Sequence, residues 1–184
     1  MDQGIAALLG ATVGVLGTIS TSAITGWSSR QQVRTQARVD HAHWRRQVRR
    51  EAYSAFLTPA HGAHDALRRA ARALIGNTNT EEADHQLQVA QEKMGLVQAT
   101  WAVLAVEGPE TVEQAANKVK TALHSMHTTL LAWRDSVGAS DLNVKYVERH
   151  AVEVTKVSER ISAVATAARA ALDEAAFPTD TNLP

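Results

Sequence analysis

The chain contains no cysteine among its 184 residues, which excludes disulfide bonds and thiolate chemistry. Proline is also scarce, with Pro59, Pro109 and Pro178 inside the chain and Pro184 at its end. Because proline interrupts helices, most of the chain is free to form long ones. No Gly-rich phosphate loop or nucleophile elbow is present, and we therefore expect no enzyme activity and no cofactor.

Charge is missing from residues 4–26, which read GIAALLGATVGVLGTISTSAITG. An uncharged apolar stretch of about twenty residues is long enough to cross a bilayer as a helix. Basic flanks stay on the cytoplasmic side, and seven arginines follow before position 51. We therefore predict a single-pass cell-membrane protein with its N-terminus outside and its body in the cytoplasm. The arginines are Arg30, Arg34, Arg38, Arg45, Arg46, Arg49 and Arg50.

Two other interpretations of this segment stay open. Small residues around Thr21–Ala23 could serve as the cleavage site of a signal peptide, although Asp2 stands where a basic region is expected and the apolar run is long. The many Gly, Ser and Thr residues also make the hydropathy marginal, so a buried soluble helix is the second alternative.

Small residues recur at every fourth position of the predicted anchor, and Gly10 and Gly14 form a GxxxG pair. Helices in lipid associate by close packing, which small residues permit. With one anchor per chain, the partner must be another chain, and we predict a homo-oligomer. The predicted oligomerisation residues are Ala6, Gly10, Gly14, Thr18, Ser22 and Gly26.

Hydroxyl side chains crowd the cytoplasmic half of the anchor. In a ring of chains, Thr18, Thr21 and Thr25 would line a lumen, which gives an alternative function as a homo-oligomeric pore with a cytoplasmic helical funnel. The same hydroxyls could instead bind backbone carbonyls of their own helix.

The rest of the chain is predicted to be all-α. Apolar residues recur with 3-4 spacing, the period of packed helices, and four such series joined by short connections imply an antiparallel four-helix bundle. The series are Tyr53, Phe56, Ala60, Ala63, Leu67, Ala70, Leu74; Leu87, Ala90, Met94, Val97, Trp101, Leu104; Val112, Ala116, Val119, Leu123, Met126, Leu130, Trp133, Val137; and Val147, His150, Val154, Val157, Ile161, Val164, Ala168, Ala171.

The predicted organisation has four parts. Residues 1–26 form the transmembrane anchor, 27–50 a basic juxtamembrane helix, 51–177 the cytoplasmic bundle and 178–184 a loose tail. Within these parts, Trp44, Val48 and Ala52 are expected to share a face. Pro59 is expected to kink or break its helix, and Thr80 to cap the next one.

Charge is unevenly distributed along the chain. Residues 27–72 carry about +7 and residues 73–184 about −6, although the whole chain is neutral. We expect the seven arginines to contact anionic lipid headgroups beside the anchor. They could instead bind the acidic helices of a partner protein, whereas nucleic-acid binding is the least favoured use because only Trp44 and Tyr53 are interleaved with them.

Histidines provide the only candidate metal ligands. His61 and His64 are spaced i,i+3, as are His124 and His127, and two such pairs could supply four nitrogens. A di-metal bundle also needs inward carboxylates, which neither pair has, so we predict no metal site and histidines on helix flanks. His150 lies on an apolar seam, where it could titrate near physiological pH or bind one carbonyl.

The run WRRQVRREAYSAFL at residues 44–57 resembles a basic R-R-x-A-Y-x-x-F-L helix found in a group of actinobacterial single-pass membrane proteins of uncharacterised activity. This resemblance covers about the first third of the chain and implies the same short anchor followed by a basic helix. We therefore expect a membrane-anchored, self-associating helical bundle that acts as a scaffold or interaction protein. A peripheral regulator that binds nucleic acid or an acidic protein is the third candidate.

Overall fold

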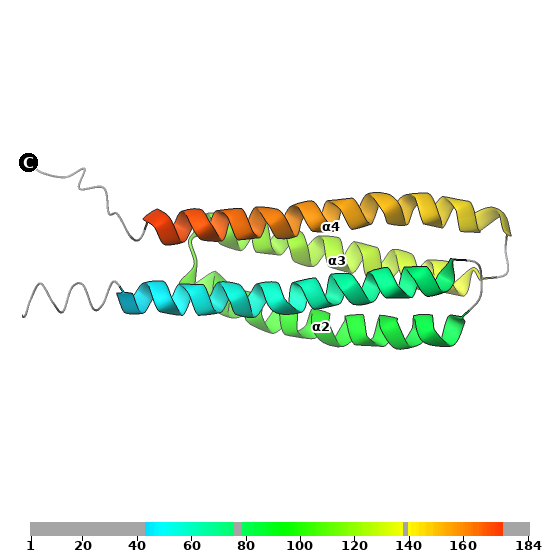
Figure 1. The fold of residues 1–184 in the computed structure, drawn as a ribbon, viewed down its shortest axis with the longest axis horizontal. Helices are drawn as coiled ribbons and strands as arrows, with labels where there is room; N and C mark the ends of the chain where they lie inside the picture. The colour runs from blue at the N-terminus through cyan, green and yellow to red at the C-terminus, as the bar shows by residue number, and fades with distance from the viewer. Residues whose placement is uncertain (1–42, 76–78, 138–139, 175–184) are drawn as a thin grey trace, which may run out of the picture. The chain divides into compact units, whose positions relative to one another are not determined.

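A computed structural model of the protein describes residues 43–75, 79–137 and 140–174, with no account of the side chains of 140–143. These residues form four helices and no strand. The first described helix covers residues 43–74 and is called helix 43–74 below. It is followed by α2 (Thr80–Glu107), α3 (Glu110–Asp135) and α4 (Ser140–Glu174). From Arg45 onward they belong to one compact unit, and the predicted all-α helical bundle is confirmed there (Figure 1).

Consecutive helices run antiparallel. The start of helix 43–74 contacts the end of α2, because Arg49 Nε donates a hydrogen bond to the backbone oxygen of Glu107 at 3.0 Å. Further along, Arg69 Nε donates to Gln86 Oε1 at 3.1 Å, near the start of α2. As the residue number rises along helix 43–74, the number of the contacting residue falls along α2. The two helices are therefore antiparallel, as in an up-down bundle.

The same ordering continues through α3 and α4. Arg134, near the end of α3, binds the carboxylate of Asp84, near the start of α2, through Nε and Nη2 at 2.8 Å each. Arg160 Nη1, in the second half of α4, donates to the backbone oxygen of Lys118, in the first half of α3, at 3.0 Å. These bonds fix which turn of each helix lies beside which turn of its neighbour.

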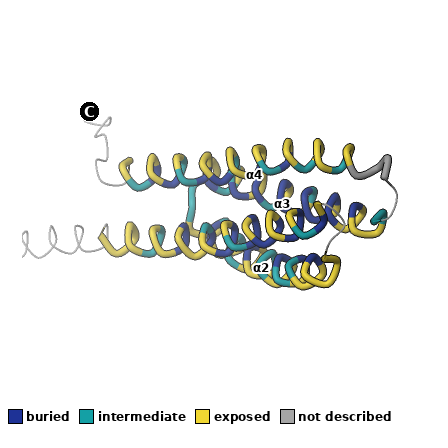
Figure 2. The backbone as a smooth tube through the Cα atoms, turned by 45° about the vertical axis from the view of Figure 1, so that its right-hand side comes forward, coloured by how far each residue is buried: buried dark blue, intermediate teal, exposed yellow. Residues whose placement is uncertain are grey.

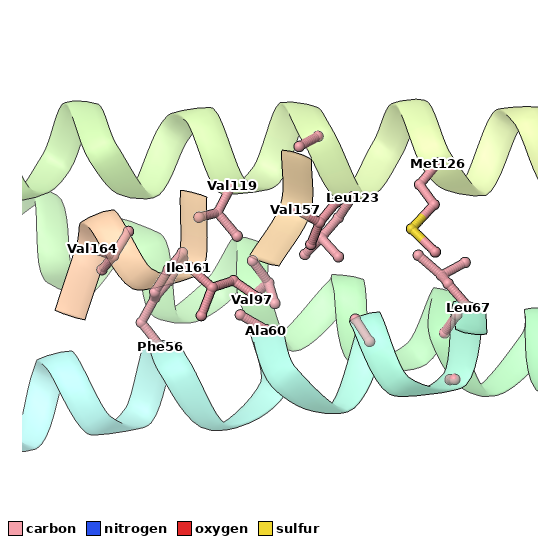
Figure 3. Packing of buried hydrophobic residues seen from close by; sticks show 14 of the residues in the cluster. Phe56, Ala60, Leu67, Val97, Val119, Leu123, Met126, Val157, Ile161 and Val164 are labelled. Carbon is pink, nitrogen blue, oxygen red and sulfur yellow. The ribbon is translucent and has the colours of Figure 1, made fainter. Parts of the chain in front are cut away.

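The core lies between the four helices and consists of their 3-4 apolar seams. Figure 2 shows buried residues recurring along one side of each helix, and Figure 3 shows Phe56, Val97, Val119 and Ile161, one from each helix, within this interior. The predicted seams of helix 43–74, α2 and α3 are confirmed, with every member buried or half-buried. Trp133 is the largest fully buried side chain.

Two local expectations are wrong. Val147, assigned to the α4 seam, is 38% exposed. The cap of α2 is Asn79 instead of Thr80, since the Asn79 side chain accepts a hydrogen bond from the backbone N–H of Glu82. Asparagine is at least as good a cap as threonine because its side-chain oxygen reaches the same N–H.

Pro59 does not break its helix, which runs unbroken from 43 to 74. Proline lacks an N–H, so the carbonyl of Ala55 receives no helical hydrogen bond from it. Ala55 is exposed, which leaves that carbonyl accessible to water. Water can replace the missing bond there at a smaller cost than at a buried turn, and Pro59 and Ala60 are buried in the bundle.

Among the described residues, no helix combines the length and the apolar composition that a bilayer crossing requires. The predicted span at residues 4–26 lies outside them.

Two glycines give a matched test of this packing. A Cβ added at exposed Gly95 would meet nothing within 4 Å, whereas one added at Gly108 would lie 2.8 Å from the backbone oxygen of Leu104. We expect Gly95→Ala to raise the free energy of unfolding by about 0.5–1 kcal/mol through helix propensity. We expect Gly108→Ala to lower it by about 1–3 kcal/mol through overpacking. Urea unfolding followed by circular dichroism measures both, and effects of the same sign would contradict the described end of α2.

Candidate functional site

The most unusual surface of the described bundle is a second apolar stripe on α2. Leu96, Val103 and Val106 are 51%, 54% and 81% exposed, and exposed Ala99 lies between them and completes a 3-4-3 spacing. We call these four residues the outer α2 face. The core seam of α2 lies on a different side of the helix, where Val97 and Leu104 are buried. α2 is therefore apolar on two sides, of which the bundle covers one.

A shallow groove of about 540 Å³ borders the outer α2 face on the side of helix 43–74. Its walls carry small side chains from helix 43–74, including Ser54, Ala55 and Thr58, opposite Leu96 of α2. Lys93 crosses the groove beside Gly62, where an added Cβ would lie 3.6 Å from Lys93 Cδ. A surface of short side chains next to an apolar stripe allows close approach of another polypeptide.

A second groove, of about 320 Å³, lies between α2 and α3. Met94, Val97 and Leu123 contribute apolar surface, and Lys120 and His124 contribute nitrogen atoms. Lys120 Nζ lies 3.6 Å from the centre of the Trp101 ring, a cation–π contact. Burial lowers the pKa of Lys120, because desolvation disfavours the charged ammonium.

Polar side chains are also buried between α3 and α4. Glu153, only 8% exposed, accepts hydrogen bonds at Oε1 from Thr129 Oγ1 at 2.9 Å and from Ser125 Oγ at 3.2 Å. Arg149 Nε lies 3.6 Å from the same oxygen. The other oxygen, Oε2, is buried and has no hydrogen-bond partner among the described residues. Two hydroxyls and one guanidinium thus offset part of the cost of burying this carboxylate.

Two histidines have ring nitrogens that face the interior, and one of them, half-buried His150, lies near Glu153. His150 of α4 lies beside Trp133, with ring centroids 6.3 Å apart, and Trp133 also stacks on Tyr146 at 6.2 Å. His64 of helix 43–74 is 6% exposed. His64 Nε2 and His150 Nδ1 are both buried without a hydrogen-bond partner in the described part of the chain. Burial is the main cause of the lowered pKa of both imidazoles. The charge of Glu153 partly offsets it for His150, and the charge of Arg68 lowers the pKa of both.

The two i,i+3 histidine pairs do not converge on one site. His61 and His124 are exposed, whereas His64 and His127 point into the bundle. Burial is the main cause of the lowered pKa of His127, which a hydrogen bond to the backbone of Leu87 partly offsets. Across the described residues, no group of three or more His, Cys, Asp or Glu is placed to hold a metal ion.

The structure tests few of the other predicted site residues. The anchor stripe (Ala6, Gly10, Gly14, Thr18, Ser22, Gly26), the lumen residues Thr18, Thr21 and Thr25, and the arginines at 30, 34 and 38 all lie outside the described residues. Of the remaining arginines, Arg45, Arg46 and Arg50 are exposed, and Arg49 is half-buried against the end of α2.

Sequence reasoning missed both the outer α2 face and Glu153. The signal for the outer α2 face was the apolar 3-4-3 series at 96, 99, 103 and 106. Positions 96 and 103 stand one residue before the core residues Val97 and Leu104, so the two series overlap in the sequence and only the core seam was recognised. The signal for the second was spacing, since Glu153 follows His150 by three residues and precedes Val157 by four. A glutamate at a position with the 3-4 spacing of the core seam is expected to be buried, and its carboxylate then needs polar partners on a neighbouring helix. Comparison with known proteins adds no further site, because no family model, curated protein or solved structure matches the chain.

The buried histidines predict that mild acid destabilises the bundle. Burial places the folded-state pKa of His64, His127 and His150 below the ordinary value of 6.5. The unfolded chain therefore binds protons first, and stability present above about pH 6.5 is lost as the pH falls toward the folded-state values. Urea unfolding between pH 7.5 and 5.5 should show this fall.

Replacement of the three buried histidines by glutamine should flatten that pH dependence. The matched control is replacement of exposed His61 and His124 by glutamine, which should leave the fall in place. The same dependence of stability on pH in the wild type, the triple variant and the control would contradict the assignment of the acid sensitivity to His64, His127 and His150.

The Glu153 hydrogen bonds can be tested with neighbouring threonines. Thr129→Val removes a buried donor to Glu153 Oε1 and should cost about 1–3 kcal/mol, the usual penalty for under-satisfying a buried polar group. Thr128→Val is the control, because Thr128 is exposed and donates only to the backbone oxygen of His124 in its own helix. Thermal and urea unfolding measure the difference, and equal losses would rule out a special role for the Thr129 bond.

Proposed function

We propose that this protein is a membrane-anchored, self-associating helical bundle that acts as an interaction scaffold. The observation that carries the proposal is the outer α2 face, which a lone bundle leaves exposed to water. Burying apolar surface stabilises a complex by roughly 25 cal/mol per Å², so a contiguous exposed stripe is typical of an interaction site. Exposed apolar side chains also occur on α4, where Val144, Val147 and Ala151 have 3-4 spacing, but Val147 is only 38% exposed and the next member, Val154, is half-buried against the core.

The sequence supports the membrane part of the proposal. Residues 4–26 have the length and the absence of charge of a spanning helix, and their small-residue stripe suits contact between chains. Further along the chain, Arg45, Arg46 and Arg50 near the start of helix 43–74 are exposed. A cationic surface at that point suits anionic headgroups, each charge contributing about 1 kcal/mol near the bilayer.

Self-association of the full chain in detergent is the direct test. We expect light scattering coupled to size exclusion to give a protein mass above that of one chain, and Leu96→Asp with Val103→Asp to lower it by burying unpaired charge in any interface. The matched control is Val144→Asp with Val152→Asp, because these α4 valines are exposed to 66% and 67% but lie off the outer α2 face. Gly10→Leu with Gly14→Leu tests the anchor contribution in the same assay. A wild-type chain that stays monomeric at every concentration would contradict the proposal.

A further inference from the structure

The outer α2 face has the spacing of a coiled-coil seam. In a seven-residue repeat whose first and fourth positions are apolar, Leu96 and Val103 take the first position, and Ala99 and Val106 take the fourth. A second helix with the same pattern would bury such a seam. We propose that the helix which covers this face is α2 of a second copy of the chain, packed antiparallel across a two-fold axis. This inference rests on the proposed function and names its partner surface.

Antiparallel pairing sets first positions of one helix against fourth positions of the other. In the register centred near residue 101, Leu96 faces Val106 of the second copy, and Val103 faces its Ala99. The two-fold axis repeats each contact, because the same patch meets itself in an isologous pair. Ala99 is the smallest member and lies close to the axis, where a short side chain lets the two helices approach closely.

Charge favours this register. The residues flanking the seam at seven-residue intervals are Lys93, Thr100 and Glu107, and the register sets Lys93 against Glu107 of the second copy, twice per pair. The stem of Lys93 lies beside Gly62, and Glu107 is exposed. Opposite charges at these flanking positions select partner and orientation.

A parallel pair lacks these advantages. Glu92 precedes Ala99 by seven residues and is exposed, so an in-register parallel pair would bring two Glu92 carboxylates together in the seam. In the antiparallel register, Glu92 instead falls opposite a position beyond the end of α2 at Glu107. Like charges placed together in an interface disfavour it.

The neighbouring surface leaves room for the second copy. On the side of Thr100, the seam borders the groove between α2 and helix 43–74. Helix 43–74 lines that groove with short side chains, including Ser54, Ala55 and Thr58. No long side chain of this wall blocks approach to Leu96. Because the two-fold axis turns the second copy end for end, the two helices 43–74 begin at opposite ends of the pair.

The absence of cysteine permits a direct test by disulfide cross-linking. Leu96→Cys and Val106→Cys are made separately in the full chain, and each protein is oxidised in detergent alone and as a mixture. In the antiparallel register, identical positions are offset by ten residues, or about 15 Å along the helix, which exceeds the Cα separation of about 7 Å that a disulfide allows. We expect the mixture to form cross-linked dimers at least several-fold more than either variant alone.

Each result of this experiment decides the question. Cross-linking in each single variant at least as strong as in the mixture would show a parallel pair, and would overturn the inference while self-association stands. If the protein is larger than one chain but neither single variant nor their mixture cross-links, the inferred α2 pairing is overturned as well. Monomers without cross-links would overturn both the inference and the proposed function.

Charge reversal provides an independent check on register. Lys93→Glu and Glu107→Lys each set like charges together across the pair, and we expect each to weaken dimer formation several-fold in low salt. The double variant restores opposite charges. In it, the mixture of the cysteine variants at 96 and 106 should cross-link as much as when Lys93 and Glu107 are unchanged. Circular dichroism confirms that every variant is folded. A double variant as weak as the two single ones would overturn the proposed register.

Discussion

Four apolar seams share one core, and each is removed from water only by the other three. Helix 43–74 contributes a seam rich in alanine, in which Ala60, Ala63 and Ala70 let the backbones approach closely. The seams of α3 and α4 contribute bulkier groups, including the fully buried Trp133. Because small and large residues face one another across the interior, the core fills without a strand or a disulfide in the described bundle. The antiparallel order, the helix ends and the surfaces left outside all follow from this shared burial.

Polar groups inside this core have an energetic cost that their partners only partly offset. Glu153 receives two hydroxyl donors at one oxygen, whereas its other oxygen and the inward nitrogens of His64 and His150 have no described partner. Burial keeps those histidines neutral at physiological pH, since the folded-state pKa of each is lowered. These two histidines, together with His127, therefore make the bundle less stable in mild acid.

α2 differs from its neighbours in carrying apolar residues on two sides. One side completes the core, and the other, from Leu96 to Val106, meets water in a single chain. A helix needs only one apolar stripe to join a bundle, so the second requires its own explanation. Self-association supplies one that also accounts for the positions of Lys93 and Glu107.

The sequence by itself determined the helical class, the four helices of the described residues and most of their apolar core, because 3-4 apolar spacing is a local property of the chain. It did not determine which of two adjacent apolar stripes on α2 faces inward, nor that Glu153 lies beside Thr129. Those depend on how each helix is rotated about its axis and on which turns lie side by side. Only the simultaneous packing of all four helices sets that rotation, which is why the tertiary structure was needed to find the candidate interaction surface.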